Sequence, residues 1–188
     1  VTHRLIANGI DGIVLPPPLC DSSKVIALLA RARMPAVAVA TDRPSDSVST
    51  ISIDDFGAAR EMTRHLVALG HRRIGFIVGH PNQTASEQRL QGYKSALPDA
   101  GIKLDPQLIA QGLFTYRSGL DAAEKLFELE HVPSAIFASN DDMAAATVAA
   151  DVVAGAAVDT AVEAALAQAM RMVGEGADII DIGGESTR

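Results

Sequence analysis

The chain has 188 residues, of which 48% are hydrophobic and 21% charged, and its formal net charge is −7 at pH 7. This length and composition suit one domain or two small ones with a sizeable core, and they exclude wholesale disorder. The acidic balance argues against a free-standing nucleic-acid binder or a basic membrane-surface protein. Cys20 is the only cysteine, which excludes an internal disulfide and a cysteine-based zinc site. No apolar run reaches the roughly 18 residues of a membrane-spanning helix, so we expect a soluble, cytoplasmic protein.

Short apolar runs alternate with helical patterns along the chain. Continuous apolar runs are typical of strands buried on both faces of a parallel sheet, and they predict strands at 12–15, 36–40, 74–78, 108–111, 135–138 and 179–182. Apolar spacing near 3.6 residues predicts helices at 59–69, 88–97, 119–129, 143–153 and 159–175. This alternation favours an α/β fold, a parallel sheet with flanking helices.

Polar residues follow three of the predicted strands. Asp42 follows the second strand, Asn140 and its neighbours follow the fifth, and Glu185 to Arg188 follow the last. Ligands of open α/β sheets bind outside the carboxyl ends of the strands, so these positions suit a small polar ligand. Asn140 and the two aspartates after it are equally suited to cap the next helix, and both interpretations remain open.

Several stretches resemble a known family: "GIDGIVLPPP", "AVATDRP", "LGHRRIGFIVG", "RLQGYKSALPDAGIKLD" and "PSAIFASNDDMAAA". On these motifs, residues 1–150 resemble the effector-binding core of the LacI/GalR-type transcriptional repressors. The resemblance implies a periplasmic-binding-protein-like (flavodoxin-like) fold, with two α/β lobes and a sugar or purine effector in the cleft between them. A periplasmic sugar-binding protein of the same fold is the nearest alternative, although "LGHRRIGFI" is more similar to the repressors.

The same resemblance implies four ligand-binding residues. Asp42 matches an acidic residue that faces the effector, and Arg89 matches an arginine that hydrogen-bonds sugar hydroxyls or a purine. Phe114 matches an aromatic residue that covers the ligand, and Asn140 matches an amide that pairs with its hydroxyls. These side chains suit a sugar, which needs fork-shaped donors, polar acceptors and an aromatic platform. The structural alternatives are a surface ion pair of Arg89 with Glu87 and a core position for Phe114.

The resemblance also predicts what is missing. The family's helix-turn-helix segment and the first strand of the first lobe would precede Val1, so we expect no DNA binding. Effector binding should be weak, because a ligand is normally enclosed between two walls and the first lobe, which would form one of them, is incomplete in this prediction. An incomplete lobe leaves an unpaired sheet edge and an apolar face, which makes self-association an expectation.

Residues 151–188 have a different composition, with seven acidic and two basic residues and no aromatic ones. The stretch "GADIIDIGGESTR" resembles dihydropteroate synthase, a TIM-barrel enzyme of folate synthesis. The resemblance places Ser186, Thr187 and Arg188 near p-aminobenzoate and pyrophosphate, as anion-binding residues. An eight-stranded barrel needs about 200 residues or more, so we expect no catalysis from this segment.

The two resemblances together predict a chimera. Its parts would be a partial first lobe at 1–50, a second lobe at 51–150, and a TIM-barrel-derived helix and strand at 151–188 that complete the second lobe. Three function hypotheses follow: a chain without selected activity, a weakened binder of a small molecule, and a phosphate-binding or folate-enzyme fragment. We expect no enzyme, no catalytic residues and no cofactor. The five histidines lack metal-ligand spacing, so we expect no metal site either.

Overall fold

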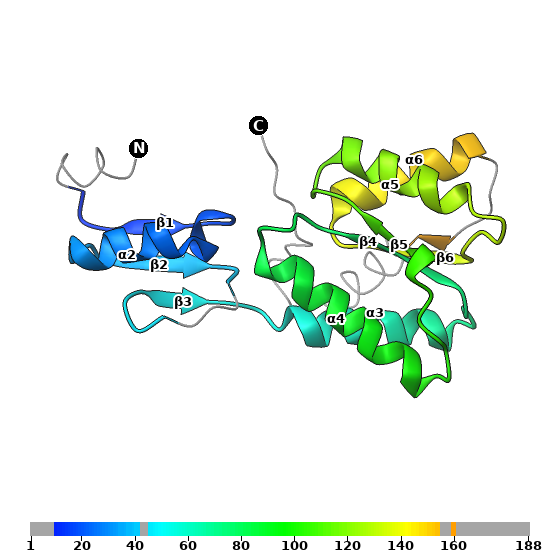
Figure 1. Cartoon of the computed structure of the whole chain (residues 1–188), viewed down its shortest axis with the longest axis horizontal. Helices are drawn as coiled ribbons and strands as arrows, with labels where there is room; N and C mark the ends of the chain where they lie inside the picture. The colour runs from blue at the N-terminus through cyan, green and yellow to red at the C-terminus, as the bar shows by residue number, and fades with distance from the viewer. Residues whose placement is uncertain (1–9, 42–44, 155–158, 161–188) are drawn as a thin grey trace, which may run out of the picture.

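The computed structural model describes residues 10–41, 45–154 and 159–160, which form two α/β units, each on its own parallel sheet (Figure 1). The first unit spans residues 10–51 and the second spans residues 55–160. The chain passes from one to the other through residues 52–54, between β3 and α3. The predicted boundary at residue 50 falls within β3.

The first unit is a three-stranded sheet with one helix packed on it. Its elements are β1 (Ile13–Leu15), the short helix η1 (Leu19–Asp21), α2 (Ser23–Arg31), β2 (Ala36–Val39) and β3 (Ser49–Ile51). The strands are parallel in the order β1-β2-β3. Helix α2 begins after Ser22, whose hydroxyl accepts a hydrogen bond from the Val25 amide at 3.4 Å. Its apolar side covers one face of the sheet and forms a small core: Leu15, Cys20, Leu29, Ala38 and Val48.

The second unit is a four-stranded parallel sheet between two layers of helices (Figure 1). In chain order it contains α3 (Asp55–Ala68), β4 (Ile74–Val78), α4 (Thr84–Asp99), η2 (Pro106–Leu108), β5 (Ile109–Gln111), α5 (Tyr116–Phe127), β6 (Ala135–Ala138), α6 (Asp141–Ala154) and β7 (Asp159–Thr160). The strand order is β5-β4-β6-β7. Helices α3 and α4 pack together on one face, and α5 and α6 pack together on the other.

Strand β4 explains why the second unit has a core on each face of its sheet. All five of its residues are buried, and successive side chains point to opposite faces. Ile74, Phe76 and Val78 join Tyr93 and other side chains of the α3–α4 layer. Ile77 joins the core beneath α5 and α6. A continuous apolar run is therefore required here, because both faces of the strand are covered.

The α/β fold with parallel sheets and flanking helices is confirmed. The strands expected at 74–78 and 135–138 have the same bounds as β4 and β6, and those expected at 12–15, 36–40 and 108–111 differ only at their ends. Strand β3 is missing from the prediction, because its residues (Ser49–Ile51) are all exposed and carry no apolar run. It forms because β2 offers a free backbone edge in register, with Ala38 opposite Thr50.

One predicted element is wrong at its start. Residues Asp159 and Thr160, expected to begin a helix, form β7 and pair parallel with Ala135 and Ile136 of β6. The open edge of β6 supplies backbone partners, and this tertiary pairing outweighs local helical periodicity. Helix α6 runs without a break through residue 150, the predicted junction of the chimera. The rest of the expected helix at 159–175 and the strand at 179–182 lie outside the described residues, so the TIM-barrel origin of this segment stays a prediction.

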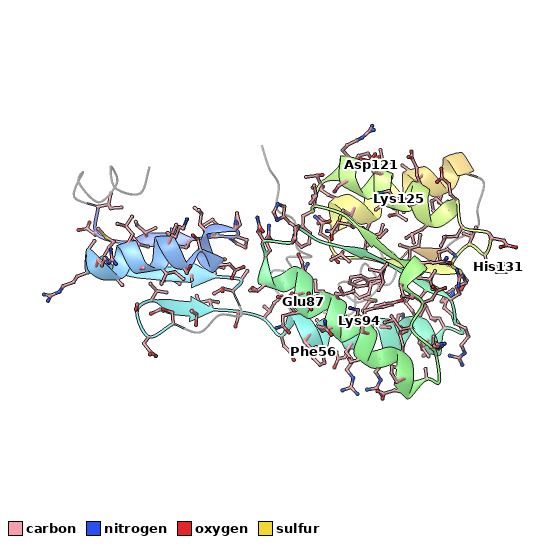
Figure 2. The ribbon with its side chains drawn as sticks, in the orientation of Figure 1. Phe56, Glu87, Lys94, Asp121, Lys125 and His131 are labelled. Carbon is pink, nitrogen blue, oxygen red and sulfur yellow. The ribbon has the colours of Figure 1, made fainter. Side chains whose placement is uncertain are left out.

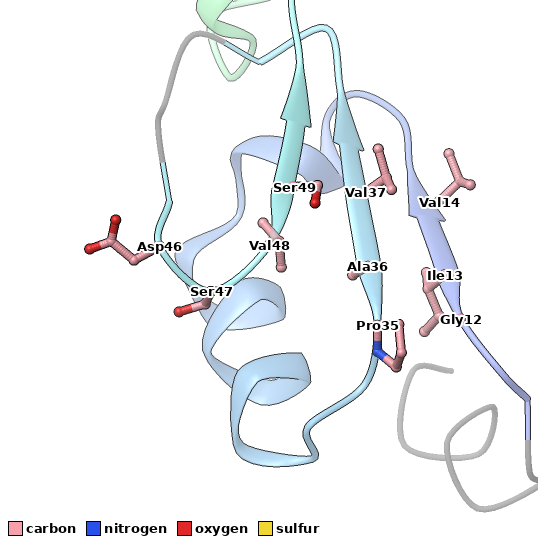
Figure 3. A pocket seen from close by; sticks show the side chains of 10 residues that line it. All are labelled: Gly12, Ile13, Val14, Pro35, Ala36, Val37, Asp46, Ser47, Val48 and Ser49. Carbon is pink, nitrogen blue, oxygen red and sulfur yellow. The ribbon is translucent and has the colours of Figure 1, made fainter.

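An open depression of about 590 Å³ lies on the first unit, lined by residues of β1, β2 and the approach to β3 (Figure 3). Val14 contributes an exposed apolar side chain to it. The depression sits toward the amino ends of the strands, whereas ligands of such sheets bind beyond the carboxyl ends. We therefore place the candidate site elsewhere.

Among the residues that the structure describes, no helix is both long and apolar enough to cross a bilayer.

Candidate ligand-binding site at the carboxyl end of the second sheet

Three of the four predicted ligand residues come together in the second unit. Phe114 follows β5, Asn140 follows β6, and Arg89 projects from α4 toward the same edge of the sheet. The Arg89 guanidinium carbon lies 5.8 Å from the centre of the Phe114 ring, within cation–π range. The Asn140 amide nitrogen donates to the Phe114 carbonyl oxygen at 3.1 Å. The carboxyl ends of parallel strands meet at one edge, which is why residues so far apart in sequence become neighbours.

Arg89 is held by two acceptors that the sequence analysis did not identify. Its Nε donates to Oδ1 of Asp55 at 2.8 Å, and the side chains are only 27% and 10% exposed. Its Nη1 donates to the carbonyl oxygen of Ser139. The guanidinium is therefore fixed in direction between α3 and the end of β6. The expected alternative, an ion pair with Glu87, is wrong, because Glu87 lies on the exposed side of α4 and accepts from Gln91 (Figure 2).

Asp55 reaches this position because its neighbour begins the helix. Asp54 is the N-cap of α3 and accepts from the Gly57 amide at 2.8 Å, which leaves Asp55 in the first helical turn. There its carboxylate is buried and turned toward Arg89. Two consecutive acidic residues at a helix start are the only sequence signal for this arrangement, and they do not say which acid caps and which pairs.

Phe114 is partly buried against the α5–α6 core, so it contacts the core without being enclosed by it. Its backbone has φ of 62°, in the left-handed region that a bulky residue seldom adopts. The turn that precedes it is fixed by Gln111, whose side-chain amide donates to the carbonyl oxygens of Gly79 at 2.6 Å and Gly112 at 2.5 Å. Gln111 is thus a second supporting residue that sequence patterns did not reveal.

Asn140 does cap the following helix. Its side-chain oxygen accepts from the Met143 amide at 3.1 Å, in the first turn of α6. The capping interpretation is therefore correct, and the ligand role is a separate question. Next to it, the Ser139 hydroxyl donates to the Ile77 carbonyl at 2.6 Å, which ties the end of β6 to β4.

The other predicted site residues are not placed. Asp42, Ser186, Thr187 and Arg188 lie outside the described residues. Within the described residues, no group of three or more His, Cys, Asp or Glu side chains could hold a metal ion.

The fold and this site define a class of ligand-binding α/β domains, and comparison with known proteins gives the family. A family model described as "Periplasmic binding proteins and sugar binding domain of LacI family" matches residues 2–172, so the chain belongs to this family. The match continues past residue 150 into the segment predicted to come from dihydropteroate synthase. The comparisons give no support for an origin of that segment in dihydropteroate synthase.

The relatives are transcriptional regulators. The regulator DegA of Bacillus subtilis is 33% identical over 143 residues, which is 75% of this chain and 42% of that protein. The repressor CytR of Escherichia coli K12 is 41% identical over 101 residues, covering 54% of this chain and 30% of CytR. Among solved structures, a complex of the transcriptional regulator CelR with cellobiose has a TM-score of 0.75 and 33% identity, covering 82% of this chain and 47% of the other.

This chain therefore spans less than half the length of these relatives. None of the three is an enzyme by its description, which agrees with the expectation that this chain is not one.

Proposed function

We propose that this chain is part of the effector-binding domain of a LacI-type transcriptional regulator and that its effector is a small sugar. The observation that carries the proposal is the convergence of Arg89, Phe114 and Asn140 at the carboxyl end of one sheet. A relative of known structure binds cellobiose, which supports a sugar as the ligand class. In this proposal the two units are the partial first lobe and the second lobe, and Asp42 is the proposed ligand residue of the first lobe.

The three side chains retain the polar and apolar surfaces that a sugar needs. A guanidinium has five N–H donors, and the hydrogen bonds of Arg89 to Asp55 and Ser139 use one on Nε and one on Nη1. The remaining donors suit hydroxyl groups. Because Asp55 neutralises Arg89 and fixes its direction, the pair favours a neutral polar ligand over an anion. The partly exposed ring of Phe114 suits the C–H face of a pyranose.

Isothermal titration calorimetry on the 188-residue chain tests this proposal, with cellobiose, glucose, ribose and adenosine as ligands. We expect a sugar to bind. The Arg89→Gln variant should bind it about tenfold more weakly, because one charged hydrogen bond to the sugar is lost. Arg117→Gln is the matched control, since Arg117 pairs with Asp121 on the exposed side of α5. Binding of adenosine alone would replace the sugar by a purine as the effector. Binding of none of the four would overturn the proposal.

The resemblance of the last residues to dihydropteroate synthase predicts a different ligand. Ser186, Thr187 and Arg188 would then bind pyrophosphate without catalysing a reaction. Titration of pyrophosphate into the chain and into an Arg188→Gln variant separates this prediction from the sugar site. Equal heats for the two proteins would exclude it.

A further inference from the structure

Asp21 of the first unit makes direct hydrogen bonds to the second unit. Its Oδ2 accepts from the backbone amide of Thr84 at 2.9 Å, and both of its carboxylate oxygens lie 3.2 Å from the Thr84 hydroxyl. Within its own unit, Oδ1 accepts from the Thr41 hydroxyl at 2.6 Å. Asp21 is only 7% exposed, although it stands at the end of the short helix η1. The first turn of α4 faces the first unit at this point (Figure 1).

The contact supplies what the start of α4 lacks locally. The N-cap residue of α4, Gln83, makes no side-chain capping hydrogen bond. The first amides of a helix have no partner within the helix, and a negative charge is favourable at that end. Asp21 provides both an acceptor and a charge, from 63 residues earlier in the chain. Helix α4 is therefore capped by a residue of the other unit, unlike α3, which is capped locally by Asp54.

The same helix carries the candidate site. Arg89 lies five residues after Thr84, within one and a half turns of α4. A helix is rigid over this length, so a shift of its first turn is transmitted to the Arg89 side chain. The Asp21 cap forms only when the two units lie close together.

We propose that Asp21 is a clamp between the two units: it caps α4 across their junction and so links their spacing to the position of Arg89. When the units separate, the Thr84 amide loses its acceptor and the start of α4 loses its compensating charge. Loss of a helix cap destabilises the first turn of the helix, and the ratio of its closed to its open form falls by about fivefold. The clamp does not require the proposed sugar function, and only its consequence for Arg89 rests on that function.

Two variants break the clamp from opposite sides. Asp21→Ala removes the acceptor from the first unit, together with its bond to Thr41. Thr84→Pro leaves the first unit intact and removes both donors. Proline is well tolerated there, because residue 84 is the first residue of α4 and Gln83 is extended, with φ of −116° and ψ of 129°. Asp54→Ala is the matched control, since it deletes an aspartate cap whose partner, the Gly57 amide, lies in the same unit.

The spacing of the units is measured by double electron–electron resonance on the full 188-residue chain, with spin labels on cysteines placed at Lys24 and Lys125. Both positions are exposed, whereas the native Cys20 is fully buried and escapes labelling. Amide hydrogen exchange at residue 84 is followed in parallel in Asp21→Ala. We expect about fivefold faster exchange at Thr84 in Asp21→Ala, and a broader distance distribution in both clamp variants.

The control should show faster exchange at Gly57 and an unchanged distance distribution. Faster exchange at Thr84 with an unchanged distance distribution in both variants would show a cap without a clamp, and would overturn the proposal. Unchanged exchange in Asp21→Ala would mean that the contact is not populated. Should Asp21→Ala fail to fold, the distance distribution of Thr84→Pro decides between these outcomes.

Discussion

The ring of Phe114 occupies the space that a side chain on Gly79 would need. A Cβ atom built on Gly79 would overlap with the far edge of the ring. Gly79 directly follows β4, and Phe114 follows the neighbouring strand β5, so this contact joins the ends of two strands at the candidate site. The absence of a side chain at residue 79 is what allows the far edge of the ring to approach the end of β4.

Gly79→Ala should therefore lower the free energy of unfolding by about 1 kcal/mol, since the ring must leave its position. In a Phe114→Ala background the same substitution should cost almost nothing, because the overlapping atoms are gone. Urea unfolding of the two single variants and the double variant gives the coupling energy between the residues. Equal costs of Gly79→Ala in both backgrounds would show that the ring does not occupy this space in solution.

The ion pair between Asp55 and Arg89 should contribute measurably to stability. Asp55→Asn is expected to lower the free energy of unfolding by about 1 kcal/mol, because a charged hydrogen bond shielded from water becomes a neutral one. The matched control is Asp121→Asn, which alters the Arg117–Asp121 pair, 83% and 49% exposed, and should change stability by less than about 0.5 kcal/mol. Urea unfolding at 0.05 and 0.5 M NaCl measures both. Indistinguishable effects of the two substitutions would mean that Asp55 does not hold Arg89.

Asn140 has a capping role that can be separated from its proposed ligand role. Asn140→Ala should lower the free energy of unfolding by about 1 kcal/mol, because the Met143 amide loses its acceptor. Serine is as good an N-cap, so Asn140→Ser should restore the stability but not the amide that a sugar would contact. Unfolding curves and calorimetric titrations of the same two variants provide the comparison. Full recovery of sugar affinity in Asn140→Ser would remove the amide from the proposed site.

Tyr93 should make the protein less stable at high pH. Burial raises its pKa to about 12 from the ordinary value of 10.0, with a further contribution from the nearby Asp105 and an opposing one from Arg73. Its hydroxyl donates to the Ile74 carbonyl at 2.8 Å. Because the unfolded chain ionises at a lower pH than the folded one, the stabilising contribution is present below about pH 10 and is lost as the pH rises toward 12.

The chain has only two tyrosines, which makes this measurement specific. In a Tyr116→Phe variant, absorbance at 295 nm reports Tyr93 alone, and its midpoint should lie near 12. Tyr93→Phe should show a smaller loss of stability between pH 10 and 12 than the parent protein, whereas Tyr116→Phe should behave like the parent. A midpoint near 10 for Tyr93 would show that its hydroxyl is not buried as the structure has it.

The sequence determined the central strands of the second sheet. Strands β4 and β6 are covered on both faces, so their residues must be continuously apolar, and such runs are visible without any tertiary information. The family motifs, together with the rule that ligands bind at strand carboxyl ends, were sufficient to select Arg89, Phe114 and Asn140 as neighbours. Strands β3 and β7 were missed, because their pairing depends on a free edge of another strand and produces no pattern in their own residues.

The tertiary structure alone decided what holds these residues in place. Asp55 and Glu87 are both plausible partners of Arg89 by charge, and only the packing of α3 against α4 makes Asp55 the partner. The contact of Asp21 with Thr84 joins residues of different units and has no periodicity or motif. Such contacts depend on the direction and spacing of side chains from different elements that the fold brings together. A sequence pattern indicates only which residues of a single helix or strand are buried.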